Sequence, residues 1–230
     1  MIALMKIAIL TGAGVSAESG LGTFRDKDGL WTRYDLEEVA TPQGFARNPA
    51  LVHDFYNARR KNALEARPNA SHDALAALGR SQHDLTLITQ NIDDLHERAG
   101  STGVIHMHGE LMRALCAACD YRWDAPPMMQ PNDPCPACAT PATRPDVVWF
   151  GEVPYHMERL AEAVARADLF VAIGTSAEVY PAAGLVELAR GDTLEINLEP
   201  SARANAFDTH RYGPATEAVP AWVAEMLDLS

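Results

Sequence analysis

Short apolar runs recur along the chain, and each ends in a polar or turn residue. Runs of this length, bounded by turn signals, are typical of buried strands. Strands are predicted over residues 6–11, 85–89, 104–108, 169–173 and 194–198. Between them, apolar positions recur at helical spacing, and we expect helices over residues 71–78, 157–166, 182–189 and 220–229. This alternation predicts an α/β fold with a Rossmann-like, doubly wound parallel sheet.

Two stretches interrupt the alternation. Residues 26–67 have a helical pattern with many charges, which Pro42 and Pro49 interrupt. Residues 113–145 are rich in proline and cysteine. We interpret them as a helical insertion and a zinc module of the ribbon type, which together form a smaller lobe. Residues 1–25, 68–112 and 146–230 then make the Rossmann-like lobe, so that we expect 1–230 to form a single domain.

The cysteines point to a metal site. All four lie in two Cys-x-x-Cys pairs, Cys116/Cys119 and Cys135/Cys138, with fifteen residues between the pairs. This spacing suits one zinc ion held by four thiolates on two facing knuckles. Four thiolates leave no open position for water, which predicts a structural zinc. A redox dithiol or two disulfides are the alternatives.

A glycine-rich turn follows the first strand directly. Its pattern, Gly12-x-Gly14-x-x-Ala17, lets backbone N–H groups approach a pyrophosphate at the start of a helix. A tight turn without a ligand uses the same glycines, so the motif alone is a weak signal. Phe24 and Arg25 lie shortly after it and add an aromatic ring and a cation beside the expected phosphates.

Polar side chains also gather where two further predicted strands end. Gln90, Asn91 and Asp93 follow the strand over 85–89, and His108 ends the strand over 104–108. Open α/β sheets bind their ligands at this edge, and an imidazole that titrates near neutral pH suits a general base. Helix capping by Asn91 or Asp93, and a structural role for the histidine, are the alternatives.

Taken together, these motifs resemble the sirtuin signature in order and spacing over nearly the whole chain. The matching segments are Gly12-Ala13-Gly14-Val15-Ser16, Phe24-Arg25, Thr89-Gln90-Asn91-Ile92-Asp93, His108-Gly109, Val147-Val148-Trp149-Phe150-Gly151-Glu152, Gly174-Thr175-Ser176 and Asn197-Leu198-Glu199. One departure is Gly22-Thr23, where many sirtuins have Pro-Asp, a form similar to that of the desuccinylase class. The resemblance implies an NAD-dependent protein-lysine deacylase.

The resemblance also implies roles for individual residues. His108 is the general base in a transfer of the acyl group from lysine to ADP-ribose, which gives nicotinamide and O-acyl-ADP-ribose. Asn91 and Asp93 hold the carboxamide of nicotinamide, while Phe24 shields the reactive carbon. The expected NAD-binding residues are Gly12, Ala13, Gly14, Ala17, Thr23, Phe24, Arg25, Trp31, Gln90, Asn91, Ile92, Asp93, His108, Gly174, Thr175, Ser176, Asn197, Glu199 and Ala215.

Tyr56 and Arg59 stand three residues apart, which on a helix puts the phenol and the guanidinium on one face. In an ordinary helix the tyrosine would pack and the arginine would be solvated. The pair resembles the Tyr-x-x-Arg of sirtuins that remove succinyl and malonyl groups, and Ala40 resembles the small residue that deepens their acyl pocket. The extended run 148–153 is expected to accept a peptide as an added strand. The expected substrate-binding residues are Ala40, Tyr56, Arg59, Val148, Phe150, Gly151, Glu152 and Val153.

Composition narrows the function classes. A net charge of -12 and scattered lysines and arginines disfavour nucleic-acid binding, because a phosphate backbone needs clustered cations. No run of eighteen apolar residues occurs, and residues 1–6 show no basic region or cleavage site. We therefore expect a cytoplasmic monomer, without membrane association, that acts on acyl-lysine proteins. The competing hypotheses are a mono-ADP-ribosyltransferase, a non-catalytic NAD-sensing module and, from the glycine turn alone, a dehydrogenase.

Overall fold

The larger lobe is built on a parallel sheet. The computed structural model describes residues 4–22 and 34–228. Six strands pair in the order β3-β2-β1-β7-β8-β9, all parallel. Their bounds are β1 Lys6–Thr11, β2 Asp84–Thr89, β3 Ile105–His106, β7 Leu169–Ile173, β8 Asp192–Asn197 and β9 Thr209–Tyr212. The chain runs from β1 outward to β2 and β3, then returns to β7 on the other side of β1. The predicted doubly wound sheet is thus confirmed.

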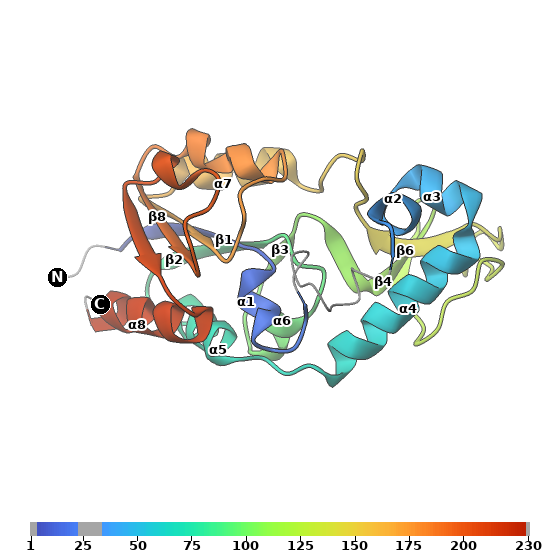
Figure 1. The fold of residues 1–230 in the computed structure, drawn as a ribbon, viewed down its shortest axis with the longest axis horizontal. Coiled ribbons are helices and arrows are strands. Elements are labelled where there is room, and N and C mark those ends of the chain that lie inside the picture. The colour runs from blue at the N-terminus through green and yellow to red at the C-terminus, as the bar shows by residue number, and fades with distance from the viewer. Residues whose placement is uncertain (1–3, 23–33, 229–230) are drawn as a thin grey trace.

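Both faces of this sheet are covered by helices (Figure 1). On one side Ile7 and Ile9 of β1 pack against α1, α5 and α8, and on the other side Ala8 and Leu10 pack against α7 and η2. The bounds are α1 Gly14–Ala17, α5 Ala70–Gly79, α6 Leu95–Arg98, α7 Met157–Arg166, α8 Ala215–Asp228, and the 3₁₀ helices η2 Ala182–Leu188 and η3 Ala204–Ala206. Burial of successive residues on both faces explains the continuous apolar runs of the sequence.

Some predicted elements differ from those observed. The strand expected over 104–108 pairs only at Ile105–His106, because the chain turns there and leaves the sheet through Gly109, whose φ is +81°. The segment 182–189 forms a 3₁₀ helix. The last helix begins at Ala215, five residues before the expected Pro220, which lies inside it. No described helix is long and apolar enough to cross a membrane.

The smaller lobe combines three helices with a three-stranded antiparallel sheet of order β5-β4-β6 (Figure 1). The bounds are α2 Leu36–Val39, α3 Pro42–Arg47, α4 Pro49–Glu65, β4 Gly109–Cys116, β5 Arg122–Asp124 and β6 Thr143–Val147. Pro42 and Pro49 begin helices, where a missing N–H costs nothing. A separate apolar cluster joins these helices to the small sheet and the segment after it, with Phe55 and Tyr56 from α4 packed against Leu111 and Trp149.

Candidate active site and metal centre

The two predicted nucleotide loops meet backbone to backbone. Gly12 donates to the carbonyl of Ile173, and Gly14 to that of Gly174, both at 2.9 Å. A Cβ added to Gly14 would lie 2.7 Å from the Cα of Gly174, and one added to Gly12 would lie 2.7 Å from the Gly174 carbonyl oxygen. Glycine is therefore required for this approach, at the point between β1 and β7 where the strand order reverses.

Polar side chains join neighbouring strand ends across this edge. Gln90 donates through Nε2 to Thr175 Oγ1 at 3.0 Å, and Asn197 donates through Nδ2 to the carbonyl of Thr175 at 2.8 Å. Ser176 follows Thr175 and is half-buried, whereas Glu199 is exposed. The structure thus brings together three of the expected NAD-binding residues, Gln90, Thr175 and Asn197.

The remaining expected NAD-binding residues lie beside or beyond this edge. Ala13 and Ala17 stand at the two ends of α1, and Ala215 begins α8 and packs against the core cluster that contains Val15. The residues expected in the segment after the glycine turn lie outside the described residues. They are Thr23, Phe24, Arg25 and Trp31.

The segment that follows β2 is held by a row of hydrogen bonds. Four consecutive carbonyls, those of residues 89–92, each accept a bond from the chain between residues 106 and 111. The bonds are Met107 N to Thr89 O at 3.0 Å, His108 Nδ1 to Gln90 O at 3.1 Å, His106 Nδ1 to Asn91 O at 3.1 Å and Leu111 N to Ile92 O at 2.7 Å. These bonds fix the positions of Asn91 and Asp93.

Asn91 and Asp93 are both buried. Asn91 donates through Nδ2 to Ser16 Oγ at 3.1 Å, and Asp93 Oδ1 accepts from the backbone of Leu95 at 3.2 Å. Burial raises the pKa of Asp93, against hydrogen bonds from Leu95 and Ser16 and the charges of His106 and Arg59. The bond from Leu95 to Asp93 is also one that a helix-capping side chain makes, because Leu95 is the first residue of α6, so the capping alternative is supported in part for Asp93. A buried amide and a carboxylate side by side are suited to recognising a carboxamide.

His108 has the tautomer that a general base needs. Its Nδ1 lies 3.1 Å from the Gln90 carbonyl, which only accepts, so Nδ1 carries the hydrogen and Nε2 keeps its lone pair. Burial lowers the pKa of His108, opposed by that bond. The ring is therefore neutral at pH 7. The carbonyl of His108 accepts from Val148 N at 2.9 Å, which attaches the predicted peptide segment to the same residue.

A buried network beneath Asn91 was missed from the sequence, where His72 and His96 seemed to have no function. His96 Nε2 lies 2.9 Å from Thr11 Oγ1, His72 Nε2 lies 3.4 Å from Ser16 Oγ, and the two imidazole centroids are 4.9 Å apart. Burial lowers the pKa of His72 to about 4 and that of His96 to about 3, so both are neutral at pH 7. A histidine on the apolar face of a predicted helix was the only sequence signal.

The predicted acyl-pocket residues come together in the smaller lobe. Tyr56 is buried, and its oxygen accepts from Trp149 Nε1 at 2.9 Å. The guanidinium carbon of Arg59 lies 6.0 Å from the Tyr56 ring centroid. Burial lowers the pKa of Arg59, against the charges of Tyr56 and Asp93. Ala40 is buried in the same cluster, and its carbonyl accepts from Phe150 N at 2.9 Å.

The expectation of an extended run over 148–153 is wrong. Glu152 N donates to the Trp149 carbonyl at 2.9 Å, which closes a turn, and Gly151 has a φ of +89°. Tertiary contacts cause this turn. The Glu152 carboxylate accepts two hydrogen bonds from Arg144, at 2.7 Å and 2.9 Å, and a third from the backbone N–H of Trp149. The Arg144 guanidinium also lies 3.5 Å from the centroid of the Trp149 ring. Phe150 and Val153 remain exposed.

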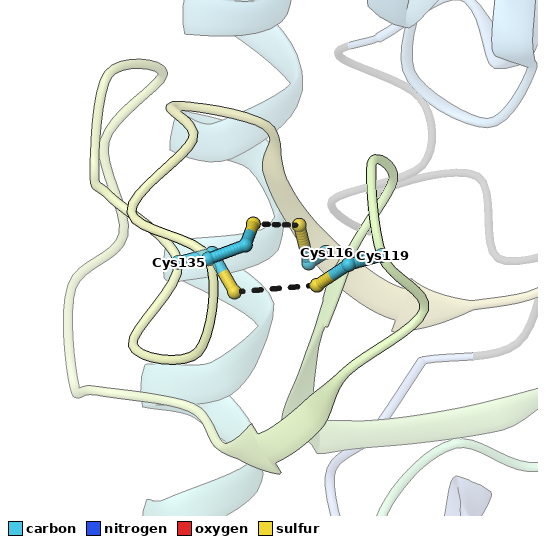
Figure 2. Close-up of side chains that lie close together, drawn as sticks. Cys116, Cys119 and Cys135 are labelled. Carbon is cyan, nitrogen blue, oxygen red and sulfur yellow. Dashed lines mark hydrogen bonds between the residues drawn. The ribbon is translucent and has the colours of Figure 1, made fainter.

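The four cysteines converge as predicted (Figure 2). Their Sγ atoms all lie within 4.8 Å of one another, with Cys116 and Cys138 at 3.7 Å and Cys119 and Cys135 at 3.8 Å. Four bonds of about 2.3 Å to a tetrahedral zinc place sulfurs about 3.8 Å apart, whereas a disulfide needs about 2.05 Å. The thiols are free, so the disulfide alternative is wrong and the donor set fits zinc.

The two cysteine pairs form matching knuckles. In each, the residue two places after the first cysteine donates its N–H to that sulfur at 3.4 Å, namely to Cys116 and to Cys135. In each, the residue four places after it has a left-handed φ, 58° at Asp120 and 60° at Ala139, and donates to the carbonyl of that cysteine at 2.9 Å. The repeated geometry aims two pairs of thiols at one point.

Comparison with known proteins identifies the family to which this architecture belongs. The model of the Sir2 family matches residues 12–181. The chain belongs to the Sir2 family. It is 61% identical to an NAD-dependent protein deacylase of Caulobacter vibrioides over 99% of both chains, and 49% identical to one of Bdellovibrio bacteriovorus over 97% of both. A Sir2 homologue in complex with NAD has a TM-score of 0.90 and 42% identity, over 98% of this chain and 91% of its own.

Membership of the Sir2 family confirms the resemblance drawn from the motifs, and the solved relatives confirm the Rossmann-like fold. A Sir2 homologue bound to ADP-ribose also has a TM-score of 0.90, at 42% identity, and covers 100% of this chain and 96% of its own. The family match begins at Gly12 and spans the cysteine module. It therefore covers the glycine turn, residues 89–93, His108 and the acyl-pocket residues.

Proposed function

We propose that this Sir2-family chain is an NAD-dependent protein-lysine deacylase that removes acetyl groups and, through Tyr56 and Arg59, succinyl or malonyl groups. The observation that carries the proposal is the placement of His108. Its Nδ1 is bonded to Gln90 on the nucleotide edge, and its carbonyl is bonded to Val148 at the start of the peptide segment. One neutral imidazole thus stands where the two substrates would meet.

NAD is the co-substrate in this proposal and supplies an activated ribose with nicotinamide as the leaving group. The closely packed backbone of Gly12, Gly14 and Gly174 would bind the pyrophosphate. Asn91 and Asp93 would hold the nicotinamide carboxamide, and Asn197 with Glu199 would hold the adenosine ribose. His108 Nε2 would accept a proton from a ribose hydroxyl. Acyl-lysine, NAD and one water molecule would give free lysine, nicotinamide and O-acyl-ADP-ribose, with the water releasing the lysine amine from the intermediate in which the acyl oxygen is bonded to the ribose.

Tyr56 and Arg59 give the acyl pocket its charge preference. Trp149 Nε1 donates to the phenol oxygen, which leaves the phenol hydrogen to be donated elsewhere. Together with the half-buried Arg59 cation, it would bind a carboxylate at the end of the acyl chain. A charged hydrogen bond of about 1.5–3 kcal/mol corresponds to a preference of about ten- to a hundredfold. The small Ala40 leaves acetyl-lysine acceptable as well.

The peptide would lie along residues 148–153, with Val148, Phe150, Gly151, Glu152 and Val153 in contact. Exposed Phe150 and Val153 offer apolar surface to the peptide on either side of Gly151, within the segment that closes the turn from Trp149 to Glu152. The Arg144–Glu152 pair would shape this surface from below.

We assign one structural zinc ion to Cys116, Cys119, Cys135 and Cys138. The four Sγ atoms match a tetrahedral ion, and a closed set of thiolates takes no part in the reaction. Metal analysis of the purified chain should find about one zinc per chain, and Cys135→Ser should lose it. Retention of zinc by that variant would disprove the assignment.

The deciding experiment compares kcat/KM for matched acetyl-lysine and succinyl-lysine peptides, with nicotinamide release followed in the same reaction. Faster succinyl turnover is the expected result. Faster acetyl turnover would keep the deacylase and remove the carboxylate role of Tyr56 and Arg59. Transfer of labelled ADP-ribose to protein without deacylation would indicate a mono-ADP-ribosyltransferase, and binding of NAD without turnover would indicate a sensing module.

A further inference from the structure

His106 lies two residues before the proposed base and is bonded on both ring nitrogens. Nδ1 lies 3.1 Å from the Asn91 carbonyl, and Nε2 lies 2.8 Å from Glu97 Oε1 on α6. A carbonyl oxygen only accepts, so Nδ1 carries a hydrogen. A carboxylate also only accepts, so Nε2 carries one too. Hydrogen-bond accounting therefore makes His106 an imidazolium, in contrast to His108.

The alternative is a neutral His106 that accepts from a protonated Glu97. The side chain of Glu97 is 42% exposed, so water stabilises its ionised form, whereas the side chain of His106 is 8% exposed. Burial alone would lower the pKa of His106, but the hydrogen bond and the charge of Glu97 outweigh burial and raise it. The charge of Glu110 and the bond to Asn91 act in the same direction. The charged pair is thus the favoured state.

The charge of His106 reaches the residues proposed to bind nicotinamide. It opposes the burial that raises the pKa of Asp93, and its Nδ1 fixes the backbone of Asn91. Another titratable neighbour of His106, His96, is neutral because burial lowers its pKa to about 3. Besides His106, Asp93 has Arg59 as an opposing cation, and that residue belongs to the acyl pocket.

We propose that His106, held by Glu97, is a positioning residue that stays protonated in the working enzyme, fixes residues 91–93 and keeps Asp93 ionised. The proposal rests on the proposed function, which assigns the nicotinamide carboxamide to Asn91 and Asp93. Glu97 acts through its bond to His106, and its charge also reaches His72, which stays neutral because burial lowers its pKa to about 4. Loss of the charge should therefore weaken the binding of NAD and nicotinamide without changing which acyl group is preferred.

The first test measures the protonation of His106 directly. NMR titration of the imidazole in the full chain, assigned with His106→Asn, should show a protonated ring at pH 7. Glu97→Gln should lower its midpoint by about one pH unit or more, because an opposite charge at hydrogen-bond distance shifts a pKa by about that much. A neutral ring at pH 7 in the unmodified chain would overturn the proposal.

The second test separates charge from hydrogen bonding. In Glu97→Gln the amide donates to Nε2 of a neutral ring, so both bonds of His106 remain while the charge is lost. We expect kcat/KM for NAD to fall about tenfold, the equivalent of one pKa unit of lost interaction, and nicotinamide inhibition to weaken similarly. The fall should be greater at pH 8 than at pH 6, because low pH restores the proton. The succinyl-to-acetyl ratio should not change.

Glu110→Gln is the matched control, since it removes the same charge from an exposed neighbour of His106. It should change NAD kinetics much less than Glu97→Gln. Equal effects of the two variants, or unchanged NAD and nicotinamide binding in Glu97→Gln, would refute the positioning role. If the unmodified chain deacylates neither peptide, the proposed function fails, and the NMR titration still decides the protonation of His106.

Discussion

The nucleotide edge of the larger lobe and the acyl-pocket wall of the smaller lobe are built by opposite means. At the edge, Gly12, Gly14 and Gly174 bring backbones so close that a methyl group cannot be inserted. At the wall, Tyr56 and Trp149 fill the space with large side chains joined by a hydrogen bond. In the proposed function, backbone geometry would serve the NAD that every reaction shares, whereas side chains would select among acyl groups. Damage to the edge should therefore affect all substrates equally, and damage to the wall should change their ratio.

Replacement of the base should give the largest effect and leave the ratio unchanged. His108→Asn keeps an N–H for the Gln90 carbonyl but removes the lone pair of Nε2. We expect kcat for acetyl and succinyl peptides to fall together by about 10²- to 10⁴-fold, the usual contribution of a general base. An unchanged melting temperature is the control for folding. A variant that is folded and active would show that another group accepts the proton.

Loss of the carboxylate clamp should be the next largest effect, and it should be selective. Arg59→Met keeps much of the volume and removes the cation, so succinyl turnover should fall about ten- to a hundredfold while acetyl turnover changes little. Tyr56→Phe should act in the same direction. Lys61→Met, on an exposed position of the same helix, is the matched control. Equal loss on both peptides would show that Arg59 supports the pocket without reading the acyl group.

Insertion of a methyl group at the nucleotide edge should give a smaller loss that both peptides share. In Gly14→Ala the new Cβ would meet the backbone of Gly174 at 2.7 Å, so the two loops must separate. We expect KM for NAD to rise about tenfold, in line with an overpacking cost of about 1–3 kcal/mol. Gly79→Ala, whose Cβ would meet Leu85 at an ordinary 3.4 Å, should not change KM. A succinyl-specific loss in Gly14→Ala would break the division between edge and wall.

The sequence predicted those parts of the molecule that depend on local pattern. Strands β1 and β7 and helix α7 match their expected bounds because apolar periodicity acts within a few residues. Gln90 was expected at the ligand-binding edge because it follows a predicted strand, whereas Thr175 and Asn197 were expected near NAD only from the resemblance to sirtuins. The four cysteines were predictable because ligand spacing is itself local.

What the sequence did not predict depends on partners distant in the chain. The turn at Trp149–Glu152 exists because Arg144 holds Glu152, and no periodicity encodes that contact. His72 and His96 meet only because α5 and α6 pack together, so neither looked unusual alone. His106 and His108 are two residues apart, yet Nε2 of His106 lies 2.8 Å from Glu97 on α6, a contact that nothing in the local sequence indicates. Tertiary contacts thus decide the chemistry of residues that the sequence merely places.

The smallest expected effect is a weak pH dependence between pH 8 and 6.5, again shared by both peptides. Burial lowers the pKa of His108 below its ordinary value of 6.5, so more than half of the rings keep a free Nε2 at pH 6.5. Protonation removes the base, and activity is therefore lost only as the pH falls further, through that lowered pKa. We expect kcat for either peptide to fall by less than about twofold over this interval, with a constant succinyl-to-acetyl ratio. A steep loss above pH 6.5 would mean that the base is more exposed than His108, and a changing ratio would mean that the titrating group lies in the acyl-pocket wall.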